Sequence, residues 1–187
     1  MTRGLRTLWG AFFVLALSAQ GVLAQGGRGE DPARIASFLR TVATHFQLPV
    51  DEVFILSEWN VAPDDVPVIL FLADRSGISP DVLVALRRAG NGWGSITSRY
   101  GLGADLLHVP MTVAEAGPLL QGLYERYEAT PRNRWGTLSL SDDEVLALVN
   151  LRVLSQGLSL APGAVMTARA NSTSFVGAHA GLGGSPR

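Results

Sequence analysis

Residues 141–151 read SDDEVLALVNL, and this stretch decides the fold class because it carries both a helix start and an apolar helix body. Ser141 and Glu144 have the spacing of a capping box, in which each side chain accepts a hydrogen bond from the other residue's backbone N–H. Val145, Leu148 and Val149 then follow at helical spacing. The sequence therefore predicts an apolar helix that begins directly after Ser141.

A second apolar run covers residues 66–73, and its pattern alone fits either a buried helix or a buried strand. A weak internal repeat favours the helix. Residues 65–87 can be laid over residues 143–169, each reading as a long apolar segment, a tight turn and a short segment begun by proline, and residues 31–53 fit more loosely. Because the copy after residue 141 is helical, we expect 66–73 to be helical too. A strand at 66–72 is the main alternative.

The other segments also read as helices. Asp31 and Pro32 are a typical N-cap and first helical residue. Thr112 and Glu115 form a second possible capping box, but Pro118 favours a start at 118 instead. The expected helices cover about 32–46, 50–56, 66–73, 80–89, 93–100, 118–128 and a last long one from 142, with a loop at 130–139. The predicted fold class is all-α: a small multi-helix bundle of loosely repeated helix-turn-helix pairs, with the two most apolar helices at its centre.

The N-terminus has the three parts of a secretory signal peptide. Arg3 and Arg6 supply positive charge, residues 8–19 are an apolar core, and residues 22–24 (Val-Leu-Ala) suit signal peptidase. The apolar run is shorter than the roughly 20 residues that a membrane span needs. We therefore expect residues 1–24 to be cleaved after Ala24, which leaves no transmembrane anchor and a periplasmic or secreted protein.

Composition bounds the remainder. A Gly-rich spacer at 25–31 precedes the expected helical domain at 32–175, and residues 176–187, rich in Gly, Ala, Ser and Pro, are expected to be a disordered tail. The chain has no cysteine, which excludes disulfides and thiolate catalysis. Its net charge is −1, and loss of the two arginines with the signal peptide makes this −3. So mild an acidic balance gives no general attraction for nucleic acid.

The most distinctive motif is Leu86-Arg87-Arg88-Ala89-Gly90-Asn91-Gly92-Trp93-Gly94-Ser95-Ile96, which predicts a helix, a glycine turn and a second helix. After the preceding Gly77-Ile78-Ser79-Pro80-Asp81-Val82, this motif resembles a group of uncharacterised exported bacterial helical proteins that share a Leu-Arg-x-x-Gly-x-Gly-Trp-Gly-x-Ile signature. The match covers about residues 64–107. No activity is established for that group, so the resemblance implies an exported helical protein and no reaction.

The same stretch also looks like the helix-turn-helix of resolvase-type DNA-binding domains. A recognition helix presents Arg, Lys, Asn or Gln to bases and phosphates. The segment 93–100 offers only Arg99 with two serines and a threonine, and an exported protein does not meet operators. DNA binding is kept as the alternative for the case that the protein is not exported.

Residues with catalytic chemistry are sparse. His45, His108 and His179 lack the spacing of a helix metal site, and a zinc site would have to gather His45 and His108 with Asp51 or Asp105. The acidic pairs stand at expected helix starts, where carboxylates complement the helix dipole. We expect no catalytic residue, metal or cofactor; an envelope hydrolase, with His45 or His108 beside a carboxylate or serine in a cleft, is the second alternative.

Tryptophans and neighbouring arginines are the candidate binding residues: Trp59, Trp93, Arg132, Arg134 and Trp135. Tryptophans in loops can anchor a partner protein or a glycan, or fold back as lids on the core. If the protein binds a partner, Trp59 or Trp135 should be exposed beside an apolar groove. The sequence thus predicts an exported helical protein with a binding or structural role toward an envelope protein or glycan.

Overall fold

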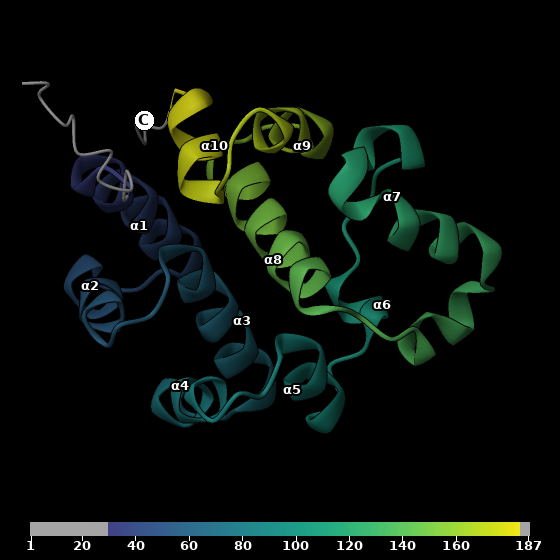
Figure 1. Cartoon of the computed structure of the whole chain (residues 1–187), viewed down its shortest axis with the longest axis horizontal. Helices are drawn as coiled ribbons and strands as arrows, with labels where there is room; N and C mark the ends of the chain where they lie inside the picture. Colours follow the sequence, from purple (N-terminus) through teal and green to yellow (C-terminus); the bar gives the residue numbers. More distant parts are fainter. Residues whose placement is uncertain (1–29, 184–187) are drawn as a thin grey trace, which may run out of the picture.

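The computed structural model describes residues 30–183, which form helices joined by turns and loops, with no strand among them (Figure 1). The predicted signal peptide and most of the spacer lie outside this range. The helices are α1 (Pro32–Phe46), α2 (Val50–Glu58), η1 (Pro63–Asp65), α3 (Val66–Ser76), α4 (Pro80–Arg88), α5 (Trp93–Arg99), α6 (Ala104–Leu107), α7 (Val113–Ala129), η2 (Arg132–Thr137), α8 (Asp142–Gly157), α9 (Pro162–Ala170) and α10 (Phe175–Gly181). No helix in the described range is long and apolar enough to cross a membrane.

Helix α8 forms the centre of the bundle and packs against α1, α3, α5, α6, α7 and α9. Figure 1 shows it running between α1 and α3 on one side and α7 on the other. The capping box of Ser141 and Glu144 is present, and the core faces of α8 include buried Val145, Leu148 and Leu151. The predicted all-α bundle is confirmed.

The ambiguous apolar run is the helix α3, and residues 66–72 are all buried. A strand there would leave its backbone hydrogen-bonding groups without a neighbouring strand, whereas a helix satisfies them within the segment. Packing of α3 against α8 and α4 covers its apolar surface. The helical alternative is therefore confirmed.

Helix α7 contains both starts that its sequence suggests. Thr112 and Glu115 form a complete capping box, so the first turn begins at Val113. Gly117 then leaves helical geometry, with φ 62° and ψ 177°, and Pro118 starts the helix again. A left-handed φ suits glycine, and proline suits a first helical turn, so the two residues together make the kink.

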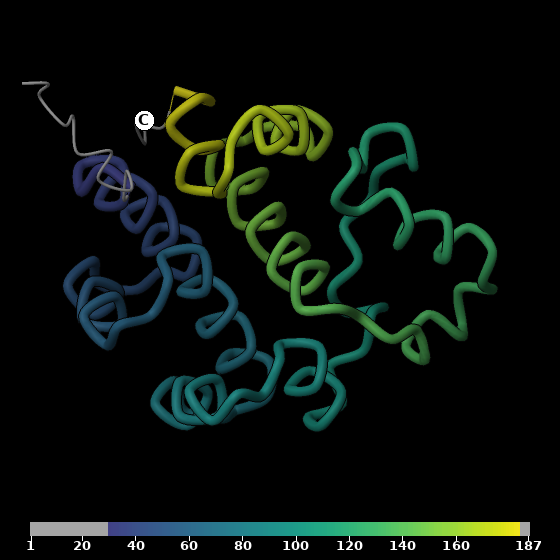
Figure 2. The backbone as a smooth tube through the Cα atoms, in the orientation of Figure 1, coloured from purple at the N-terminus to yellow at the C-terminus, as the bar shows by residue number. Residues whose placement is uncertain are grey.

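The disordered tail predicted for 176–187 is wrong over its described part, since residues 175–181 form α10 and pack against α1 and α9. Asp64 of η1 accepts hydrogen bonds from the backbone N–H groups of Phe175 (2.8 Å) and Val176 (3.1 Å). His179 is buried, and its Nε2 lies 2.9 Å from the Thr41 hydroxyl of α1. The backbone trace in Figure 2 shows α10 returning beside α9 and close to α1. Distant residues thus cap and cover a segment whose composition looks disordered.

Gly94, in the glycine turn motif, meets the start of α8 too closely for any side chain. A Cβ on Gly94 would lie 2.0 Å from the carbonyl oxygen of Leu140. We predict that Gly94→Ala lowers the free energy of unfolding by about 1–3 kcal/mol through overpacking, measured by urea denaturation. Gly122, on the exposed side of α7 with nothing within 4 Å of its Cβ position, is the matched control. Gly122→Ala should stabilise by about 0.5–1 kcal/mol; equal effects at both positions would contradict the packing assigned to Gly94.

Candidate functional site

Trp59 stands at the C-cap of α2 and lines an apolar groove with a volume of about 600 Å³. The backbone carbonyl of Trp59 accepts a hydrogen bond from the Arg88 guanidinium of α4, which fixes the end of α2 beside α4. We call this the Trp59 groove. Its apolar lining is Phe46, Leu48, Ile55, Leu56, Trp59, Leu70, Ala73, Ile78 and Pro80. The indole is half-buried, and Ile55 beside it is 48% exposed, so the groove presents apolar surface to solvent.

Carboxylates are the charged groups of the Trp59 groove. Glu52 of α2, Asp74 of α3 and Asp81 of α4 line it, and no arginine or histidine does. All three residues are exposed, so they form a rim rather than a buried acidic site. An apolar floor with an acidic rim matches a partner that offers apolar side chains between basic ones.

Trp135 folds back on the protein instead of standing free. It lies in η2, half-buried, and its indole N–H is shared between the carbonyl oxygens of Tyr127 (3.0 Å) and Thr130 (2.9 Å) at the end of α7. Its ring centroid is 4.5 Å from that of His108. The guanidinium of Arg132 lies 5.2 Å from the Trp135 ring centroid. Trp135 therefore has the second of the two arrangements considered for the loop tryptophans: its side chain is folded back on the core.

Trp93 is a core residue, so the prediction that it binds a partner is wrong. Its side chain is fully buried, and its indole N–H donates a 2.7 Å hydrogen bond to Asp65. The Arg87 guanidinium lies 4.8 Å from the Trp93 ring centroid and bonds Asp142 at 2.7 Å. Trp93 therefore joins α5 to η1, and Arg87 of α4, which covers its ring, makes the bond to the start of α8. Arg132 and Arg134 are exposed but line neither the groove nor the pocket described next.

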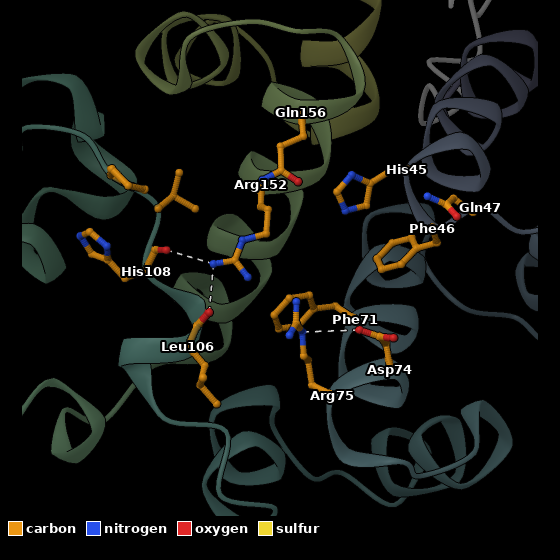
Figure 3. Close-up of a pocket in the computed structure, with 12 residues that line it drawn as sticks. His45, Phe46, Gln47, Phe71, Asp74, Arg75, Leu106, His108, Arg152 and Gln156 are labelled. Atoms are coloured by element: carbon orange, nitrogen blue, oxygen red, sulfur yellow. Dashed lines mark hydrogen bonds and ion pairs between the residues drawn. The ribbon is translucent and has the colours of Figure 1, made fainter.

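A second concave surface lies on the other side of Phe46 and Asp74, which line both (Figure 3). It has a volume of about 570 Å³ and we call it the cationic pocket. Its lining is His45, Phe46, Gln47, Phe71, Asp74, Arg75, Leu106, His108, Val109, Pro110, Arg152 and Gln156. These residues come from α1, α3, α6, α8 and the segments after α1 and α6, so the pocket exists only in the folded protein.

Burial sets the protonation of the pocket histidines. It lowers the pKa of His45 and of His108; the positive charge of Arg152 lowers the pKa of His45 further, and those of Arg132 and then Arg152 lower the pKa of His108 further. The imidazoles are therefore more readily neutral than free histidine, because a positive charge is disfavoured where water is partly excluded. Within residues 30–183 no group of three or more His, Asp or Glu side chains is placed to hold a metal ion.

Sequence reasoning missed the two arginines of the cationic pocket. Arg75 ends the apolar run of α3, and Arg152 interrupts the apolar body of α8. One signal could have identified Arg152: it is a charged residue within a helix that is apolar on most sides. Arginine is seldom buried unless it is paired, so such a position indicates a partner or a ligand. Comparison of the whole chain with family models, with curated proteins and with solved structures finds no match.

Proposed function

We propose that this chain is an exported protein that acts by binding, without catalysis, and that the Trp59 groove holds its partner. One observation carries the proposal: a tryptophan and a half-exposed isoleucine stand side by side in an apolar groove of about 600 Å³. Aromatic anchors in pockets of this kind dominate the binding energy of many interfaces. Export rests on the signal peptide features of residues 1–24.

The proposed partner is a protein segment with apolar and basic side chains. A helix laid in a groove contributes apolar residues at positions i, i+3, i+4 and i+7, and basic residues between them would face Glu52, Asp74 and Asp81 at the rim. A glycan is the other partner considered. Sugars stack on an aromatic face and need polar side chains close to it for their hydroxyls, whereas most of the lining around Trp59 is aliphatic and the carboxylates lie at the rim.

Two features support this proposal over DNA binding. Arg87 and Arg88, the basic residues of the glycine turn motif, are engaged within the fold by Asp142 and by the carbonyl of Trp59. On α5, Trp93 and Ile96 are buried, so the face they occupy has no access to a DNA groove. A reading helix needs its base-contacting side chains free.

Hydrolysis is a second candidate function, and a specific observation favours it. His45 and His108 line the cationic pocket together with Asp74. Among the described residues, however, no hydrogen bond joins either imidazole to Asp74, which pairs with Arg75 at 3.4 Å. Turnover of a chromogenic ester that is abolished by His108→Asn would favour hydrolysis over binding.

Two synthetic peptides of about 15 residues test the proposed function. Both carry leucine at i, i+3, i+4 and i+7; the remaining positions are lysine in one and glutamate in the other. We expect the lysine peptide to bind, with the affinity falling about tenfold or more in Ile55→Arg. Val82 on α4 is the matched control, because it is 42% exposed, close to the 48% of Ile55, but does not line the groove.

Val82→Arg should leave the affinity of the lysine peptide unchanged, and fluorescence anisotropy of labelled peptide measures all three proteins. Failure of the lysine peptide to bind would contradict the proposal. So would equal binding of the glutamate peptide, or an equal loss in both arginine variants, since these results would show binding without use of the groove.

A further inference from the structure

We propose that the cationic pocket is a binding site for a small organic anion, a carboxylate or a phosphate monoester, held by Arg152 and Arg75. Figure 3 shows both guanidinium groups reaching the pocket, Arg152 from α8 and Arg75 from α3. The pocket adjoins the Trp59 groove, with which it shares Phe46 and Asp74, but the inference does not depend on the function proposed for that groove.

Arg152 is held in place with part of its hydrogen-bonding capacity free. Its Nη2 donates to the carbonyl oxygens of Leu106 and His108, both at 2.9 Å. Its Nε and Nη1 have no partner among residues 30–183, and no carboxylate in that range pairs with it. A guanidinium whose orientation is already fixed loses little side-chain entropy when it binds a carboxylate or phosphate through two parallel hydrogen bonds.

A second cation shares an aromatic ring with Arg152. The Cζ atoms of Arg152 and Arg75 lie 5.1 Å and 5.6 Å from the centroid of Phe71. Burial lowers the pKa of Arg152, and the positive charge of Arg75 lowers it further. Two like charges near one ring repel each other, and an anion bound close to both would offset that repulsion.

Asp74, the one carboxylate among the lining residues of the pocket, can offset only one of the two arginine charges. Asp74 lies 3.4 Å from Arg75, but the two side chains are 65% and 54% exposed, and exposed ion pairs of this type contribute little. The pocket therefore keeps an excess of positive charge over Asp74. In the rest of the described chain, Arg87 and Arg126 bond Asp142 and Glu144 directly, which distinguishes Arg152 from them.

The remaining lining defines the body of the ligand. His45, His108 and Gln156 offer polar atoms, while Phe46, Phe71, Val109 and Pro110 form apolar walls. A volume of about 570 Å³ lies within the range of small-molecule sites, about 300–1,000 Å³. An inorganic ion would leave these walls empty, so the pocket fits an anion attached to an apolar or aromatic group.

Isothermal titration calorimetry with benzoate, phenyl phosphate and the uncharged benzamide tests the proposal. We expect benzoate or phenyl phosphate to saturate a single site and benzamide not to bind. Comparison of the first two shows which anionic group the pocket prefers. Inorganic phosphate should bind more weakly than phenyl phosphate, because it lacks the apolar group that the walls would contact.

Arg75→Gln is the decisive variant, because Arg75 is exposed and its side chain bonds no backbone group, so the fold should survive. Arg99→Gln is the matched control: it makes the same charge change at an exposed position of α5, away from both the pocket and the groove. We expect Arg75→Gln to weaken anion binding about tenfold or more and Arg99→Gln to leave it unchanged. Equal loss in both variants, equal binding of benzamide, or no saturation by either anion would overturn the proposal.

Discussion

Replacing Trp93 with alanine is expected to lower the free energy of unfolding by about 3–5 kcal/mol, the range for large aromatic side chains removed from a core. The Trp93 side chain is fully buried, its indole N–H bonds Asp65, and Arg87 covers its ring. The truncation would leave a cavity and remove a hydrogen-bond donor from Asp65. Urea denaturation followed by circular dichroism measures the change.

Trp59→Ala is the matched control for the core role of Trp93, since it removes the same side chain from a half-buried position in the groove. The loss of unfolding free energy should be clearly smaller than in Trp93→Ala. The half-buried Trp59 side chain buries less apolar surface on folding, and its removal leaves no large internal cavity. A stability loss in Trp93→Ala no larger than in Trp59→Ala would contradict the core role of Trp93.

Asp64→Ala is expected to have the second largest effect, a decrease of about 2–4 kcal/mol in the free energy of unfolding. The structural loosening should be greatest in α10. The carboxylate accepts two backbone hydrogen bonds from Phe175 and Val176, and hydrogen bonds to a charged group contribute about 1.5–3 kcal/mol each. Burial nevertheless raises the pKa of Asp64 above its ordinary value, despite those two bonds. The desolvation of the carboxylate offsets part of the gain, which keeps the expected loss below the sum of two such bonds.

Hydrogen exchange locates the effect of Asp64→Ala. Amide protection should fall in residues 175–181 more than in α8. Asp31→Ala is the control, because Asp31 caps α1 through a single exposed bond to Ala33 of 2.9 Å, and its loss should amount to about 0.5–1 kcal/mol. Unchanged protection of α10 in Asp64→Ala would contradict the capping assigned to Asp64.

The helices with local signals could be predicted from the sequence. Ser141 and Glu144 mark the start of α8 through a capping box whose members are three residues apart. Asp31 as N-cap and Pro32 as first helical residue mark the start of α1. Such caps depend only on neighbours in the chain, so a sequence pattern contains all the information. Helix α10 has a local N-cap, Ser174, which accepts a hydrogen bond from the N–H of Gly177. Its short Gly- and Ala-rich sequence shows no helical pattern, and the first two N–H groups of the helix bond Asp64, which lies 111 residues before Phe175.

The same distinction between local signals and distant contacts applies to the candidate sites. Trp59 could be proposed because it is a tryptophan between two expected helices. Whether a loop tryptophan is exposed depends on the hydrogen-bond acceptors around it in the folded protein. The indole N–H of Trp135 bonds two carbonyl oxygens at the end of α7, which the sequence did not indicate. The cationic pocket could not be assembled from the sequence, because Arg75, His108 and Arg152 stand far apart in the chain and meet only through the packing of α3, α6 and α8.

Export is the central claim, because the choice of a binding function over DNA binding depends on it. Expression of the full chain in a bacterial host, cell fractionation and N-terminal sequencing test it most directly. We predict a product in the periplasm or the medium that begins at Gln25. A product retained in the cytosol with Met1 intact would contradict the account.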